Sequence, residues 1–207
     1  MSARRRAAIQ LAAVALGLLP LARLCERALA GDLGANPIEE VTHVTGRTAL
    51  RLLLATLAVT PLRRWLRWSW AAPLRRTLGL LTFLYASLHF LTYAVLDQSL
   101  DWPSIVDDVK KRPYVTAGFT AFLCLVPLAA TSTRAMARRL GRRWKTLHRL
   151  VFVAAAAAVV HHLWLVKGED LREPLVHAAV LLLLVAARLP RTPRSPVRGP
   201  ALGSSAS

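Results

Sequence analysis

The fold class is decided by TLGLLTFLYASLHFLTYAVL, the segment at Thr77–Leu96. These 20 residues contain no Asp, Glu, Lys or Arg. An α-helix of this length is about 30 Å long, which matches the hydrocarbon thickness of a bilayer. Every backbone N–H and C=O must be paired within the segment in lipid, so the segment is predicted to be a transmembrane helix. No stretch of the chain alternates with a period of two, which makes a β-barrel a poor alternative.

Similar apolar runs lie on both sides of this segment. They are Ala8–Leu24, Val41–Leu62, Tyr114–Thr131, Leu147–Val166 and Pro174–Leu189. We therefore predict an all-α integral membrane protein, in which a bundle of six transmembrane helices forms one domain at residues 1–189. The tail at 190–207 is rich in Pro, Arg and Ser and is predicted to be disordered.

The composition excludes several classes of soluble protein. The chain has 207 residues, of which 55% are hydrophobic, and its 28 Lys and Arg against 11 Asp and Glu give a net charge of +17. Disordered chains are poor in apolar residues, and two cysteines are too few for a disulfide scaffold. A nucleic-acid-binding module would explain the basic charge but not the apolar runs. A membrane protein with basic cytoplasmic loops explains both.

The charges alternate in sign from one connecting segment to the next. The two terminal segments and the second and fourth connections hold 19 of the 28 basic residues, counting Arg149 and Arg188 at the span edges, and no acid. All eleven acids lie in the other three connections or at their edges. Because cytoplasmic loops carry the excess of Lys and Arg, both termini are predicted to be cytoplasmic. The acidic connections would then form an outer surface that could meet a partner.

The N-terminus also has some features of a cleavable signal peptide. Basic residues at Arg4–Arg6 precede an apolar run, and Ala28–Ala30 provides small residues at a possible cleavage site. Cleavage would leave five spans. Retention is the preferred interpretation, because the run at Ala8–Leu24 has the length of a full span and contains Pro20.

Histidines inside the predicted spans are candidates for chemistry. His89 lies seven residues from the outer end of its span and His161 five residues from the outer end of its own, which places them roughly 10 and 8 Å deep. Two neutral imidazoles at similar depth on two helices suit the axial positions of a haem iron. Each histidine could instead only hydrogen-bond a neighbouring helix.

A third intramembrane histidine, His148, lies near the cytoplasmic end of the span that contains His161. The 13 intervening steps correspond to about 20 Å along a helix. On an ideal helix His148 shares a face with His162 and not with His161, so the spacing alone leaves His161 and His162 as alternatives. His148 could hold a second haem with an unidentified partner, serve a flavin or quinone, or lie at the membrane interface beside lipid.

His43, Arg47 and Arg51 recur every four residues in the second span and so share one helix face. Arg51 lies about ten residues inside the span, and no acid was found within the spans. A haem propionate is a fitting partner, because arginine binds carboxylates through two parallel hydrogen bonds. Hydrogen bonds to backbone carbonyls are the alternative.

Several stretches together resemble the ferric-reductase-like transmembrane haem domains, and in particular the haem-binding membrane subunit of bacterial protein-methionine-sulfoxide reductase systems. They are GANPIEEVTHVTGRTALRLLLATLAVTPLRR (34–64), RRTLGLLTFLYASLHFLTYAVLD (75–97), KRPYVTAGF (111–119), LAATSTRAMARRLGRRWKTLHRLVF (128–152), HLWLVK (162–167) and EPLVHAAVLLLLVAAR (173–188). By this resemblance, the haem histidines are His89 and His161, and His148 is the third intramembrane histidine. His43, Arg47 and Arg51 also fit the pattern of the family.

The resemblance implies b-type haem and FMN as cofactors and a bacterial inner membrane as the location. It implies electrons from the quinone pool or a cytosolic flavin reductase, and a soluble periplasmic molybdopterin-containing catalytic subunit as the acceptor. The chain would then be the electron-transfer subunit and not the catalytic one. The absence of a GxGxxG motif agrees with an electron source outside the chain.

Two other classes of function remain open from the sequence. One is a stand-alone transmembrane haem reductase that reduces a small molecule such as a ferric chelate. The other is a membrane anchor or transporter without redox chemistry.

Overall fold

A computed structural model of the chain describes residues 3–67, 71, 73–166 and 170–188, and the described residues contain helices and turns but no strand. The helices are α1 (Ala3–Leu29), α2 (Pro37–Trp65), α3 (Leu74–Leu91), the π-helical turn η2 (Thr92–Asp97), α4 (Trp102–Lys111), α5 (Pro113–Ala130), α6 (Arg134–Leu140), α7 (Arg142–Leu147), α8 (Leu150–Leu165) and α9 (Arg172–Ala186). The tail at 190–207, which the sequence predicts to be disordered, lies outside the described residues.

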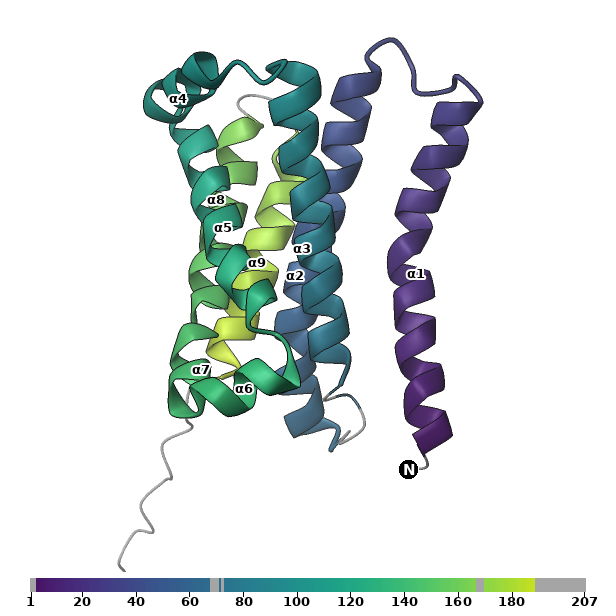
Figure 1. Ribbon diagram of the computed structural model, residues 1–207, viewed down its shortest axis with the longest axis vertical. Coiled ribbons are helices and arrows are strands. Elements are labelled where there is room, and N and C mark those ends of the chain that lie inside the picture. Colours follow the sequence, from purple (N-terminus) through teal and green to yellow (C-terminus); the bar gives the residue numbers. More distant parts are fainter. Residues whose placement is uncertain (1–2, 68–70, 72, 167–169, 189–207) are drawn as a thin grey trace, which may run out of the picture.

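Helices α2, α3, α5, α8 and α9 form a bundle, and α1 lies beside it next to α3 (Figure 1). The main core lies between α2, α5 and α8. Its buried side chains are Leu53, Leu57, Leu125, Leu128, Val151, Ala154 and Ala155. The two alanines have no exposed surface, and small residues of this kind let helix backbones approach closely in a membrane bundle.

A buried tyrosine attaches α1 to α3. Pro20 interrupts α1, and an unbroken helix would pair the Leu21 N–H with the Gly17 carbonyl. The Tyr85 hydroxyl of α3 accepts a hydrogen bond from the Leu21 N–H at 3.0 Å and donates one to the Gly17 carbonyl at 2.8 Å. Tyr85 is fully buried. The hydroxyl therefore satisfies the backbone groups at the proline site of α1 and fixes this helix against the bundle.

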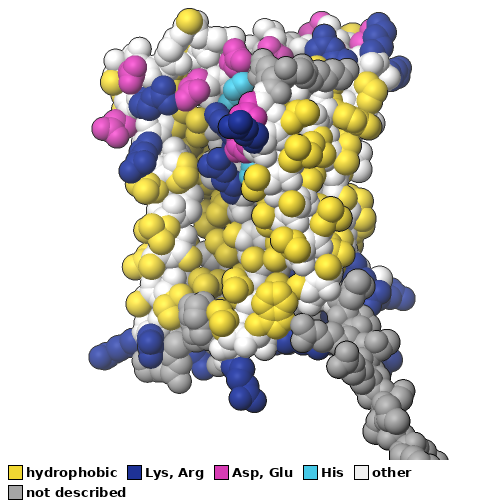
Figure 2. Space-filling view, turned by 180° about the vertical axis from the view of Figure 1, so that it is seen from behind, with side chains coloured by type: hydrophobic (Ala, Val, Ile, Leu, Met, Phe, Trp, Pro, Cys, Tyr) yellow, Lys and Arg dark blue, Asp and Glu magenta, His cyan; other side chains and the backbone are white. Residues whose placement is uncertain are grey.

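The outside of the bundle is apolar where a membrane would surround it. Figure 2 shows hydrophobic side chains around the middle of one face, acidic and basic side chains together at the end that carries α4, and basic side chains at the opposite end. Within the described residues, four helical segments are long and apolar enough to cross a membrane: Arg4–Leu29, Leu74–Asp97, Pro113–Ala130 and Arg142–Leu165. Helices α2 and α9 are not among them. Arginines interrupt the outer half of α2, and α9 has only 15 residues.

The structure also contains three short helices, α4, α6 and α7, in stretches that the sequence predicts to be connections, and α7 lies within the segment Arg142–Leu165. In addition, the run at Leu147–Val166 is not one continuous helix. A turn at His148 and Arg149 separates α7 from α8, which begins at Leu150. The angle between His148 and His161 on an ideal helix therefore does not describe their relative orientation.

Candidate functional site

The structure brings His89 of α3 and His161 of α8 together. The centroids of their rings are 6.1 Å apart, and the ring planes are inclined by 76°. Both side chains line a cavity of about 690 Å³, whose lining also includes Asp97 and Arg112 on either side of α4 in the chain. This volume lies within the range of about 300–1,000 Å³ that is typical of ligand and cofactor pockets.

His89 is held against α2 in a specific orientation. Its Nδ1 lies 3.0 Å from the carbonyl oxygen of Thr42. A carbonyl oxygen only accepts, so Nδ1 donates and the unprotonated Nε2 is free to bind a metal. One turn further along α2 is Gly46, where an added Cβ would lie 2.9 Å from the imidazole. The absence of a side chain at Gly46 therefore makes room for the ring.

His161 is held against α5 in the same way. Its Nδ1 lies 2.7 Å from the carbonyl oxygen of Tyr114, and an added Cβ at Gly118 would lie 2.8 Å from this nitrogen. In both cases the carbonyl precedes the glycine by four residues and the histidine by 47. We call each set of carbonyl, glycine and histidine a bracket. Each bracket fixes the tautomer and the ring orientation, as outer partners of metal-binding histidines do.

Stacked aromatic side chains line the wall of the cavity between the two brackets. Phe90 of α3 stacks on Phe122 of α5 with ring centroids 4.9 Å apart, and it meets the edge of Phe119 at 5.7 Å. These rings give the cavity an apolar wall beside the two imidazoles, which suits a flat and largely apolar cofactor.

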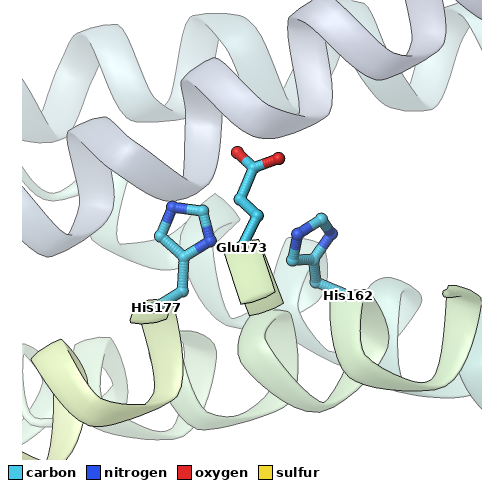
Figure 3. Close-up of side chains that lie close together, drawn as sticks. All are labelled: His162, Glu173 and His177. Carbon is cyan, nitrogen blue, oxygen red and sulfur yellow. The ribbon is translucent and has the colours of Figure 1, made fainter. Parts of the chain in front are cut away.

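His162 also lines this cavity, but its ring contacts α9. Its ring centroid lies 5.5 Å from that of His177, and Glu173 lies with them (Figure 3). Spacing along the sequence leaves His161 and His162 as alternatives, and the structure places only His161 opposite His89.

The arginines of α2 have a partner that the sequence did not indicate. The Arg51 Nη2 donates to Glu173 Oε1 at 2.7 Å, and the Arg47 Nη1 lies 3.8 Å from Glu173 Oε2. The Arg51 side chain is 63% exposed at the surface of the bundle, and its partner is an acid that lies just outside the predicted spans. Glu173 was not counted as an acid within a span, because it lies one residue before the predicted span that begins at Pro174. His43 is exposed and, like Arg47, lines the cavity.

His148 lies at the junction of α7 and α8, 13 residues before His161. Its ring stacks on Trp144 with centroids 3.9 Å apart, and its Nδ1 lies 3.1 Å from the Trp144 carbonyl oxygen. Its Nε2 is buried and has no hydrogen-bond partner within the described part of the chain. All six histidines of the chain lie in the described residues, and no other histidine ring contacts that of His148.

Sequence reasoning missed the residues that support the histidines: Thr42, Gly46, Tyr114 and Gly118. Two of them contribute only a backbone carbonyl, which any residue carries. The two glycines act through the lack of a side chain. The only available signal was the equal spacing of 43 residues from Gly46 to His89 and from Gly118 to His161, and two occurrences are too few to stand out as a repeat.

Comparison with known proteins places these features in a family. Residues 45–159 match the family described as "Ferric reductase like transmembrane component". Three similar relatives are each named protein-methionine-sulfoxide reductase heme-binding subunit MsrQ. The chain is 47% identical to that of Ralstonia nicotianae over 88% of its own length and 85% of the relative's length. It is 53% identical to that of Rhodospirillum rubrum (83% and 83%) and 49% identical to that of Deinococcus radiodurans (86% and 87%). No solved structure matches the chain.

Proposed function

The chain belongs to the ferric-reductase-like haem-binding subunits of protein-methionine-sulfoxide reductase, and we propose that it carries electrons across the bacterial inner membrane through haem b. It is a multi-pass membrane protein of this family. As the haem-binding subunit it moves electrons, and reduction of methionine sulfoxide takes place on a separate catalytic subunit.

The observation that carries the proposal is the pair of brackets. His89 and His161 lie opposite each other with both Nδ1 atoms engaged by carbonyls, which leaves each Nε2 for the iron. Bound haem supplies reversible one-electron chemistry. The chain supplies the two axial imidazoles, their fixed orientation and an apolar wall. The donor set and the cavity therefore fit a haem with two histidine ligands.

The distribution of charge supports an orientation for the chain. We propose that all six predicted spans cross the membrane with both termini in the cytoplasm, since the basic segments lie at one end and the acids at the other. The brackets then lie near the periplasmic side. A soluble periplasmic molybdopterin-containing subunit is the proposed acceptor, and the surface at the end that carries α4, where acidic side chains lie among basic ones, is available to meet it (Figure 2).

The cytoplasmic end is the proposed point of electron entry. His148 has a buried Nε2 without a partner, and it is stacked on the flat ring of Trp144. These groups suit the headgroup of a quinone or the ring of FMN, with the quinone pool or a cytosolic flavin reductase as the donor. The lack of a second histidine beside His148 favours such a group over a second haem.

We propose that Arg47 and His43, which line the cavity, interact with the haem propionates. Arg51 acts one step further away. It holds Glu173, whose other carboxylate oxygen faces Arg47. Arg51 therefore contributes to the charge around the haem without a direct contact.

The test is an absorption spectrum of the purified protein before and after reduction, followed by reoxidation with the periplasmic catalytic subunit and methionine sulfoxide. We expect a low-spin b-type spectrum that is reoxidised only when both are present. Reoxidation by a ferric chelate alone at the same rate would favour a stand-alone haem reductase, and a protein without a haem spectrum would contradict the proposal.

A further inference from the structure

Three side chains outside the haem brackets converge between α8 and α9. His162 comes from the last turn of α8, and Glu173 and His177 come from successive turns of α9. Each offers one ligand atom, and these three atoms lie within 4.8 Å of one another. Figure 3 shows the Glu173 side chain between the two imidazole rings.

Each of the two imidazoles has a buried nitrogen without a hydrogen-bond partner among the residues that the structure describes. They are the Nε2 of His162 and the Nδ1 of His177. The His177 residue is only 8% exposed. Burying an imidazole nitrogen without a partner costs free energy, because the hydrogen bond to water is lost and not replaced. Such unpaired nitrogens call for a specific explanation.

We propose that His162, Glu173 and His177 form a binding site for a divalent transition-metal ion, with Zn²⁺ as the best match. Two imidazoles and one carboxylate are a common zinc ligand set, and three protein ligands leave one position for water. Zinc–ligand bonds of about 2.0–2.2 Å require the ligand atoms to approach to roughly 3.4 Å. Small side-chain rotations would bring the present arrangement to that distance.

The arginines of α2 fit the role of outer partners. Arg51 hydrogen-bonds to one oxygen of Glu173, and Arg47 lies near the other. Carboxylates that bind metals are commonly hydrogen-bonded in this way, which fixes their orientation and keeps them ionised. The site would link α8 and α9 to α2 through this carboxylate.

The proposed ion is distinct from the haem iron. His161 and His162 are neighbours in sequence, but His161 is bound to the Tyr114 carbonyl of α5 and faces His89, whereas His162 faces His177 of α9. Loss of this ion therefore leaves both haem ligands in place. Failure of the metal site and failure of the haem proposal are distinguishable, because one is measured as bound zinc and the other as the haem spectrum.

The first experiment is zinc binding to the full-length protein in detergent, after removal of any affinity tag and treatment with a chelator. Zn²⁺ is added by equilibrium dialysis, and bound metal is measured by elemental analysis. We expect one zinc per chain. His177→Ala should weaken binding at least tenfold and keep the haem spectrum. Glu173→Gln should weaken zinc binding by a similar factor.

Two matched control variants test whether zinc binds at other histidines or acids of the chain. His148→Ala removes a half-buried histidine at the other end of the molecule, and Asp170→Asn removes an acid three residues before Glu173. Both should retain full zinc binding. Zinc binding that is unchanged in His177→Ala, or far below one equivalent in the unaltered chain, would overturn the proposal.

A second measurement uses the unaltered protein, so its result does not depend on whether a variant protein folds. X-ray absorption at the zinc edge of the loaded, unaltered protein should show two imidazoles and at least one oxygen around the ion. A shell with sulfur, or with water oxygens and fewer than two imidazoles, would also overturn the assignment.

Discussion

The two ends of the helix bundle use histidine differently. At the end that carries α4, His89 and His161 come from two helices, and each is oriented by a third helix through a carbonyl and a glycine. At the other end, His148 is oriented by Trp144 of the preceding helix, and no second histidine meets it. Axial ligation of haem by histidine at both positions requires two imidazoles that face each other. This difference is the basis of our proposal that haem binds at one end and a quinone or flavin at the other.

The largest expected effect comes from removing either bracket histidine. His89→Ala and His161→Ala should each abolish the low-spin b-type spectrum, because each imidazole supplies one iron bond. His162→Ala is the matched control and should retain it, since this ring faces α9. Haem per protein is measured by absorption after extraction. If His162→Ala lost haem and His161→Ala kept it, His161 would not be an iron ligand.

The comparison of the two ends is tested most directly at His148. His148→Ala should leave haem content unchanged, and the rate of haem reduction by a quinol or reduced flavin should fall about tenfold, which corresponds to roughly 1.4 kcal/mol of lost interaction with the donor. Stopped-flow absorption measures this rate. Loss of haem in this variant would instead indicate a second haem at the cytoplasmic end.

The bracket glycines should have intermediate effects. Gly118→Ala places a methyl group within 3.2 Å of three atoms of the His161 ring, and Gly46→Ala places one 2.9 Å from two atoms of the His89 ring. Overpacking of this kind costs about 1–3 kcal/mol, so haem should bind roughly 5- to 150-fold more weakly. The effect should be larger for Gly118→Ala, because the methyl group meets more of the ring.

Gly79→Ala is the control for the glycine variants. An added Cβ there meets only Thr56 Cγ2 at 3.8 Å, an ordinary contact. Alanine also favours a helix over glycine by up to about 1 kcal/mol. Haem affinity should therefore be unchanged in Gly79→Ala. An equal loss of haem in all three variants would show that helix packing, and not the brackets, decides haem binding.

The smallest expected effect concerns the arginines of α2. Arg47→Ala should lower the haem reduction potential by some tens of millivolts, where 59 mV corresponds to 1.4 kcal/mol for one electron, because a positive charge near the iron favours the reduced state. Arg51→Ala should have a smaller effect, since its guanidinium is exposed and paired with Glu173. Arg64→Ala, in the last turn of α2, is the control. A redox titration that gives the same shift for Arg47→Ala and Arg64→Ala would rule out a direct contact with the haem.

The sequence by itself determined the helical membrane class, the segregation of charge and the family. These properties depend on the composition of segments of about 20 residues, so they do not depend on how the helices pack against one another. The similar depth of His89 and His161 also follows from the sequence, because depth depends only on the number of residues from the end of a span.

Only the tertiary structure decided which side chains face each other. The choice between His161 and His162 depends on how α8 is rotated, and the turn at His148 and Arg149 prevents that rotation from being extrapolated along the chain. The pairing of Arg51 with Glu173 joins residues 122 positions apart. The brackets depend on backbone carbonyls and on the absence of side chains at two glycines. Such contacts leave no distinct residue type to recognise, because they exist only once neighbouring helices have packed together.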